Sequence, residues 1–135
     1  MSYLLDTNVC IHLLNNTRRA VSMRLAEQEP EDIYLSTVTQ MELYYGAYRS
    51  AQVERNQAIL QRFFSQFVVL PLDPESARVA GRIRAQLAAL GTPIGPYDSQ
   101  IAAIAIVNNL VLVTHNTGEF NRVNGLQIED WEEEG

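Results

Sequence analysis

The sequence predicts an α/β protein in which a mostly parallel sheet lies between two layers of helices, a three-layer α/β/α sandwich. Short apolar runs alternate with longer segments of helical character along the chain. The 135 residues are 47% apolar, which is enough for the core of one ordinary domain. The sequence contains no linker, repeat or low-complexity tract, so residues 1–135 are expected to form a single domain with an acidic tail at about 129–135.

The N-terminal half is expected to contain two buried strands and four helices. Thr7 or Asn8 is expected to cap the first helix, because either side chain can accept a hydrogen bond from a free backbone amide. Thr37 followed by Gln40 matches a capping box at the start of the third helix. The expected strands are 2–5 and 33–36, and the expected helices are roughly 8–15, 18–28, 37–48 and 52–66.

The C-terminal half contains the clearest helix signals. Asp73, Pro74 and Glu75 provide an N-cap, a proline at the first position and an acid in the first turn. Gly91 is expected to end that helix, and Pro96 is expected to start the next one. The remaining expected elements are strands at 67–72 and 110–114, a helix from 96 to about 108, a turn or short helix at 117–121 and an extended piece at 126–129.

The charged residues exclude several kinds of function. All ten basic residues are Arg, so Schiff-base chemistry, Walker-type phosphate binding and a lysine general base are excluded. Five of the acids lie within the last seven residues, and without them the net charge of −6 would be −1. This acidic end is expected to be mainly a solvated terminus. The net negative charge argues against a protein that coats nucleic acid by bulk charge, but it does not exclude nucleic acid as a substrate.

The N-terminus and the cysteine content indicate a cytoplasmic protein without a membrane span. No apolar run approaches 18 residues, and no basic region precedes Asp6, so a transmembrane helix and a signal peptide are not expected. Cys10 is the lone cysteine, which excludes an internal disulfide. A zinc site would need more nitrogen or sulfur ligands than His12, His115 and Cys10 readily provide.

Four of the sixteen acids occupy positions that suggest a common site. Asp6 ends an apolar strand, and Glu42 lies one turn inside the helix after the second strand. Asp98 lies in the first turn of the most apolar helix, and Glu119 follows the fourth strand by five residues. Each acid alone also fits an ordinary turn, helix-face or first-turn role. Because ligands gather beyond the carboxyl ends of parallel strands, we expect the four acids to share one cleft.

A cleft lined with carboxylates has a direct chemical use. Crowded carboxylates repel one another unless they are protonated or neutralised, and Mg²⁺ or Mn²⁺ neutralises them through oxygen ligands. One or two such ions can activate a water molecule and stabilise the leaving oxygen of a phosphodiester. The four acids therefore predict hydrolysis of a nucleic-acid backbone.

Four sequence blocks contain these acids: LLDTNVCIHLL at 4–14, STVTQMELYYGA at 36–47, PIGPYDSQIAAIAI at 93–106 and LVLVTHNTGEFNRVNGLQIEDW at 110–131. In this order and spacing they resemble PIN-domain ribonucleases, specifically the VapC-type toxins of type II toxin–antitoxin pairs. The resemblance covers essentially the whole chain. It implies a small α/β/α sandwich around a parallel sheet and Mg²⁺- or Mn²⁺-dependent endonucleolytic cleavage of RNA.

The resemblance also implies roles for individual residues. Asp6 and Asp98 match the metal-binding acids of the family, and Glu42 matches a helix glutamate that binds the metal or orients the attacking water. Many members have an Asp soon after the fourth strand, in a pattern like T-x-D-x-x-F, and here Asn116 occupies that position. Either Asn116 donates a neutral carbonyl oxygen or Glu119 reaches into the site instead. One fewer fixed charge should weaken the binding of a second ion.

Residues beside the acids are expected to hold them in place. Thr7, Asn8 and Thr114 lie next to the matched positions and can donate hydrogen bonds to the carboxylates. The departure at Asn116 leaves an alternative open, a non-catalytic PIN-like module that binds RNA or protein. A haloacid-dehalogenase-type phosphatase fits poorly, since it needs a second Asp where Asn8 stands and a lysine that the chain lacks.

Partners follow from the same resemblance. Proteins of this family have a cognate antitoxin that covers the acidic cleft, often with an Arg, and they are usually homodimers. The substrate is expected to be RNA, and the block at 110–131 most resembles members that cleave initiator transfer RNA in the anticodon loop.

Overall fold

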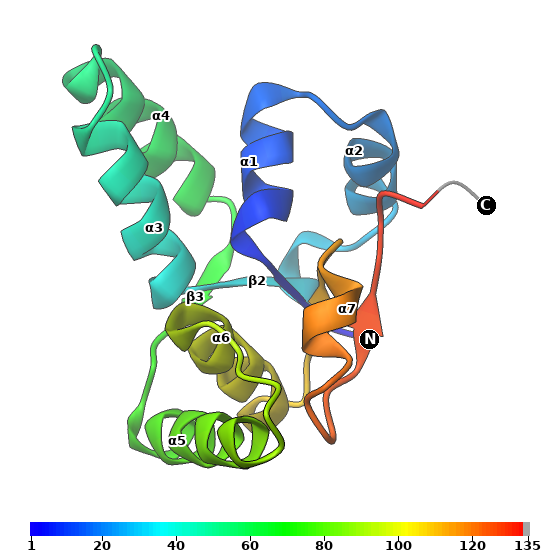
Figure 1. Cartoon of the computed structure of the whole chain (residues 1–135). Helices are drawn as coiled ribbons and strands as arrows, with labels where there is room; N and C mark the ends of the chain where they lie inside the picture. The colour runs from blue at the N-terminus through cyan, green and yellow to red at the C-terminus, as the bar shows by residue number, and fades with distance from the viewer. Residues whose placement is uncertain (134–135) are drawn as a thin grey trace.

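The computed structural model describes residues 1–133, and its five strands form one sheet with the order β3-β2-β1-β4-β5 (Figure 1). Every neighbouring pair of strands is parallel, so the sheet is fully rather than mostly parallel. The strands are β1 (Tyr3–Leu5), β2 (Ile33–Ser36), β3 (Val68–Leu70), β4 (Val111–Val113) and β5 (Ile128–Glu129).

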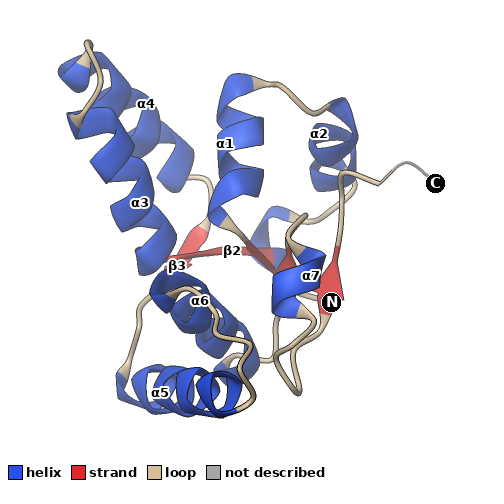
Figure 2. Cartoon of the chain, viewed as in Figure 1, coloured by secondary structure: helices blue, strands red, loops and turns tan. Residues whose placement is uncertain are grey.

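Helices cover both faces of this sheet, which confirms the predicted α/β/α sandwich. Figure 2 shows the strands nearly edge-on, with α5 and α6 below them and α1 to α4 above. None of the helices in the described part of the chain has the length and apolar character of a membrane span. The helices are α1 (Thr7–Asn15), α2 (Arg19–Ala26), α3 (Thr37–Tyr48), α4 (Val53–Phe64), α5 (Pro74–Ala89), α6 (Pro96–Val107) and α7 (Thr117–Phe120), with a 3₁₀ turn at Pro30–Asp32.

The central strand β1 contributes to two hydrophobic cores. Leu4 packs in the cluster formed with α5 and α6, whereas Tyr3 and Leu5 pack in the cluster formed with α1, α3 and α4. This alternation is the two-residue period of a strand. Because both faces of β1 are covered, the strand is a continuous apolar run in the sequence. The buried strand holds Asp6, the next residue, firmly in place.

Two helix caps differ from those predicted. Asp6, rather than Thr7 or Asn8, is the N-cap of α1, and its Oδ1 accepts a hydrogen bond from the Thr7 backbone amide. Ser36, rather than Thr37, caps α3. In both places the helix starts directly after the strand without a loop, so the residue that ends the strand is already extended and becomes the cap. The predicted cap at Asp73 is confirmed.

The C-terminal segment is part of the sheet and core up to Glu132, so its interpretation as a mainly solvated terminus was wrong there. Strand β5 pairs with β4, and Trp131 is 1% exposed with its ring 5.2 Å from that of Tyr3. The tryptophan gives the segment enough apolar surface to dock, and its acids meet basic partners described below. Residues 134–135 of the predicted tail lie outside the described residues.

Candidate active site

Asp6 lies at the point where the strand order of the sheet reverses. Strands β2 and β3 add to one side of β1, and β4 and β5 add to the other, so a crevice is expected beyond the ends of β1 and β4. Asp6 follows β1 and Thr114 follows β4, and the Thr114 hydroxyl donates a 2.8 Å hydrogen bond to Asp6 Oδ2. Both residues are buried. The two strand ends therefore fix the Asp6 carboxylate.

Glu42 reaches the same crevice from α3. The Thr7 hydroxyl donates a 2.8 Å hydrogen bond to Glu42 Oε1 and lies 2.9 Å from the Thr39 hydroxyl. Since the Thr7 hydrogen is directed to Glu42, Thr39 acts as the donor to Thr7. Thr39 is a positioning residue that the sequence analysis missed, and its place one helical turn before Glu42 was the available signal. Asn8 is exposed and forms no side-chain hydrogen bond within residues 1–133, so it does not hold a carboxylate.

Asp98 and Glu119 meet at the start of α6. Asp98 lies in the first helical turn and is partly buried, and its Oδ2 is 3.5 Å from the point where a Cβ on Gly95 would lie. The Gly95 backbone amide donates a 3.1 Å hydrogen bond to Glu119 Oε1. The Asn116 side-chain amide donates a 2.8 Å hydrogen bond to Glu119 Oε2. Asn116 thus orients Glu119, and Glu119 is the acid that follows β4 into this region.

The four acids repel one another in this arrangement. Burial, followed by the charges of Asp6, Glu119 and Glu42, raises the pKa of Asp98 to about 6. Burial also raises the pKa of Asp6, against the hydrogen bonds from Thr114 and Thr7. None of the salt bridges in residues 1–133 involves any of these four acids. Their hydrogen-bond donors are neutral, so the negative charge remains uncompensated.

The donor set of this cleft fits a hard divalent cation. Its side chains offer carboxylate and hydroxyl oxygens from Asp6, Glu42, Asp98, Glu119 and Thr114, with neither sulfur nor imidazole among them. Magnesium and manganese prefer such oxygen ligands. Within residues 1–133 no three of these carboxylates have ligand oxygens within 4.8 Å of one another. A cation placed between them would still offset the charges that raise the pKa of Asp98.

The PIN domain family matches residues 3–126 of this chain. The chain is also 44% identical over 131 residues to the tRNA(fMet)-specific endonuclease VapC of Shigella flexneri, covering 97% of this chain and 98% of the relative. The chain belongs to the VapC family of PIN-domain ribonucleases. A second VapC relative, ribonuclease VapC2 of Haemophilus influenzae, is 37% identical over 97% of this chain and 98% of its own length.

Solved VapC structures have the same fold. The structure of DNA-bound VapBC from Salmonella typhimurium has a TM-score of 0.90 and 43% identity, with 97% of this chain and 98% of that chain covered. VapBC2 from Rickettsia felis, bound to a promoter DNA fragment, has a TM-score of 0.89 and 32% identity, with 97% and 99% covered. The predicted family and fold are confirmed, while the roles of the individual acids stay predictions.

Proposed function

We propose that this VapC-family chain is a Mg²⁺- or Mn²⁺-dependent endoribonuclease and the toxin of a toxin–antitoxin pair, working in the cytoplasm. The observation that carries the proposal is the meeting of Asp6, Glu42, Asp98 and Glu119 at one edge of the sheet without a basic partner within residues 1–133. Relatives of 44% and 43% identity are named tRNA(fMet)-specific endonucleases, which supports initiator transfer RNA as the substrate.

The side chains divide the work of the reaction. Asp6 and Asp98 would hold the cation, and Glu42 would bind it or orient the attacking water. When bound, a divalent cation supplies positive charge that activates water and stabilises the leaving oxygen. Thr114 and Thr7 keep Asp6 and Glu42 in fixed orientations through 2.8 Å hydrogen bonds, so the carboxylates need little rearrangement during the reaction.

Glu119 is the fourth acid of the proposed site. Its position is set from two sides, by the Gly95 amide and by the Asn116 side chain. A carboxylate keeps lone pairs after accepting two such hydrogen bonds and can still accept a ligand. Asn116 would then act by orienting Glu119. Glu119 supplies the fourth negative charge of the site, which the neutral Asn116 side chain does not carry.

An antitoxin and a second copy of the chain are the proposed partners. The neighbouring solved structures include VapBC complexes from three organisms, which supports an antitoxin partner for this chain. An uncompensated carboxylate cleft also attracts arginine, whose guanidinium pairs with carboxylates in a bidentate manner. A basic antitoxin segment would therefore compete with the cation for Asp6 and Asp98.

Cleavage of total cellular RNA by purified, antitoxin-free protein tests the proposal. Wild type, Asp98→Asn and the exposed control Glu133→Gln are each incubated with Mg²⁺, Mn²⁺ or EDTA, and the RNA ends are mapped by sequencing. We expect cuts at one site that need the metal, persist in Glu133→Gln and disappear in Asp98→Asn. Equal cutting by wild type and Asp98→Asn would reject the assigned site.

The alternative is a PIN-like module that binds RNA or protein without cutting it. Asn116 favours this alternative, since many family members have an Asp at that position. A ligand that binds only the folded state raises the melting temperature, so a metal site can be detected without a substrate. Folded wild type that neither cuts RNA nor gains stability at millimolar Mg²⁺ or Mn²⁺ would support the binding module.

A further inference from the structure

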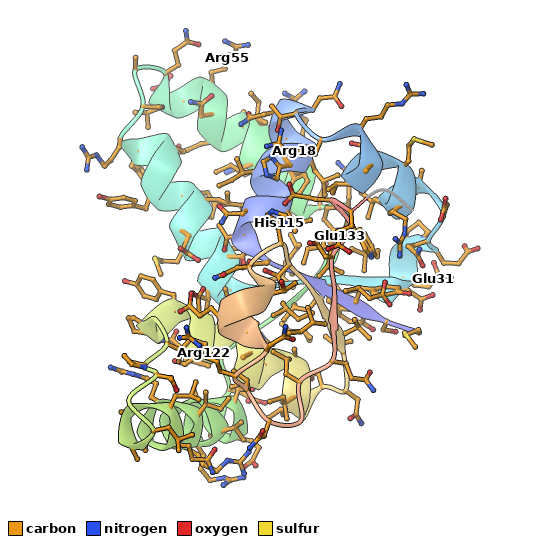
Figure 3. The ribbon with its side chains drawn as sticks, turned by 45° about the vertical axis from the view of Figure 1, so that its right-hand side comes forward. Arg18, Glu31, Arg55, His115, Arg122 and Glu133 are labelled. Carbon is orange, nitrogen blue, oxygen red and sulfur yellow. The ribbon has the colours of Figure 1, made fainter. Side chains whose placement is uncertain are left out.

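A second group of metal-ligating side chains lies outside the cleft, where the C-terminal segment passes the loop after β4. The ligand atoms of His115, Asp130 and Glu132 all lie within 4.8 Å of one another. His115 Nδ1 is 2.9 Å from Asp130 Oδ2 and 3.8 Å from Glu132 Oε2. Figure 3 shows the exposed His115 near the middle of the view, with Glu133 of the C-terminal segment to its right.

His12 approaches this group from α1. Its Nε2 is 3.8 Å from Glu132 Oε2, which is too long for a hydrogen bond. Its Nδ1 lies 2.8 Å from the Thr17 hydroxyl, so the ring is held by its other nitrogen. Metal-binding histidines are commonly held in this way, with one nitrogen bonded to a neighbour and the other free for the ion. Both histidines of the chain therefore point at Glu132.

The carboxylates of Asp130 and Glu132 are largely shielded from solvent, and a neighbouring group binds only one of the two oxygens of each. The side chains of Asp130 and Glu132 are 8% and 9% exposed. Asp130 Oδ1 accepts the Glu132 backbone amide, and Glu132 Oε1 accepts Arg18 Nε at 3.1 Å. Each carboxylate thus has one oxygen fixed by a neighbour and presents its other oxygen to His115. Arg18 also offsets one of the two negative charges. When both histidines are neutral, as metal binding requires, the group keeps a net charge of −1.

We propose that His115 Nδ1, Asp130 Oδ2 and Glu132 Oε2 bind a borderline transition-metal ion such as Zn²⁺, with His12 Nε2 as a fourth ligand. Imidazole and carboxylate are both ordinary zinc ligands. Ligand atoms about 2.0–2.2 Å from a tetrahedral zinc lie about 3.3–3.6 Å from one another. His115 Nδ1 lies 2.9 Å from Asp130 Oδ2 and 3.8 Å from Glu132 Oε2, and these separations bracket that range, so both contacts need adjustments of only a few tenths of an ångström. His12 lies outside the group whose ligand atoms are all within 4.8 Å of one another, so its ring must move closer to complete the set.

The proposed zinc site combines both histidines with carboxylates, which a count of nitrogen and sulfur ligands leaves out. Counting nitrogen and sulfur ligands gave His12, His115 and Cys10, but Cys10 is fully buried in the core cluster of α1, α3 and α4. The missing ligands are carboxylates from the C-terminal segment. An ion here ties that segment to α1 and to the loop whose neighbouring residues, Thr114 and Asn116, orient Asp6 and Glu119.

Zinc titration of a variant that lacks the main cleft acids distinguishes binding at the proposed site from binding in the cleft. In an Asp6→Asn/Asp98→Asn background, calorimetric titration with Zn²⁺ in the presence of millimolar Mg²⁺ is expected to show one bound ion per chain. Adding His115→Gln should weaken that binding about ten-fold or more, whereas the control Glu133→Gln should leave it unchanged. Absence of zinc binding in the cleft variant, or equal binding after His115→Gln, would overturn the proposal.

The two histidines give a direct readout in the wild-type chain, which is independent of how well the variants fold. Long-range proton–nitrogen correlation spectra resolve the side-chain nitrogens of both rings. Saturation with Zn²⁺ should shift Nδ1 of His115 and Nε2 of His12 to the metal-bound range. Spectra in which both rings keep their zinc-free shifts would contradict the proposal.

Discussion

The acids of the cleft and the acids of the C-terminal segment follow neighbouring strands of one sheet, yet their electrostatic surroundings are opposite. Glu129, Asp130 and Glu132 each contact a basic side chain. Asp6, Glu42 and Glu119 accept hydrogen bonds from neutral donors. The charges of these three acids raise the pKa of Asp98.

This difference separates acids whose charge is offset by other side chains of the chain from acids that are left unneutralised. Acids that meet arginine or histidine within the chain have their charge offset by the fold itself. Acids that are gathered and left unneutralised cost folding free energy, and such clusters are typical of sites that bind something positive. The cleft is therefore the place where charge removal should change activity most, and the C-terminal segment the place where it should change stability.

The largest expected effect is the loss of cleavage when Asp6 is neutralised. Asp6→Asn keeps the shape of the side chain but removes a charge that holds the cation. Metal-ion catalysis provides several kcal/mol of charge stabilisation, so we expect cleavage of transfer RNA to fall about 1,000-fold or more. The measurement is the single-turnover rate in Mg²⁺, with circular dichroism to verify the fold. A rate within a few-fold of wild type would remove Asp6 from the site.

A smaller loss is expected when a hydrogen bond to the cleft is removed. Thr114→Val deletes the hydroxyl that donates to Asp6 Oδ2 and accepts the Asn116 amide. Groups that orient metal ligands typically change metal affinity or activity about 10–100-fold. The rate is measured as a function of Mn²⁺ concentration, with Thr92→Val, whose hydroxyl bonds the Leu87 carbonyl rather than an acid, as the control. If Thr114→Val behaved like Thr92→Val, the hydroxyl would not be orienting Asp6.

The pH dependence of stability tests the repulsion inside the cleft. The pKa of Asp98 is raised to about 6 in the folded state, so protonation stabilises the metal-free protein at low pH. This contribution is fully present below the ordinary pKa of Asp and is lost as the pH rises through about 6. Asp98→Asn should then melt a few degrees above wild type at pH 7.5 in EDTA.

The melting curves of both proteins should converge as the pH falls towards 4, where Asp98 is protonated in the wild type too. Adding Mn²⁺ at pH 7.5 should stabilise wild type and not Asp98→Asn. An Asp98→Asn protein that is less stable than wild type in EDTA at pH 7.5 would show that the carboxylate is structural.

The smallest expected effect concerns the C-terminal segment. Arg24 donates a 3.1 Å hydrogen bond to Glu129 and stacks 5.6 Å above the Trp131 ring. Because the pair is partly exposed, Arg24→Ala should lower the free energy of unfolding by only about 1 kcal/mol. Urea denaturation measures this loss, and Arg55→Ala on α4 serves as the matched control. A marked loss of RNA cleavage without a loss of stability would contradict the assignment of this segment to the fold.

Much of the fold could be predicted because its signals are local. Each βα unit combines a short apolar strand with a polar residue that starts the next helix, and at Asp73 this signal gave the correct cap. After the first strand it predicted the cap one or two residues too late, at Thr7 or Asn8 instead of Asp6. The rule that ligands gather beyond the carboxyl ends of parallel strands also placed the acids after β1 and β4 at the same edge of the sheet. These features depend on neighbours in sequence and on general rules for parallel sheets.

The parts that could not be predicted depend on distant contacts. Arg18 and Glu132 are 114 residues apart, and the single sequence has no signal that pairs them. The contact of Gly95 with Glu119 likewise arises only when α7 docks against the start of α6. For this reason the sequence predicts a solvated acidic tail and leaves the choice between Asn116 and Glu119 open.

Binding of Mn²⁺ to the antitoxin-free protein is the most direct test of the central claim, that the unneutralised acids of the cleft hold a divalent cation. Electron paramagnetic resonance of free Mn²⁺ counts the bound ions in wild type, Asp6→Asn and His115→Gln. We predict saturable binding in wild type and in His115→Gln, and its loss in Asp6→Asn. Binding by Asp6→Asn equal to that of wild type, or no binding by wild type, would contradict the claim.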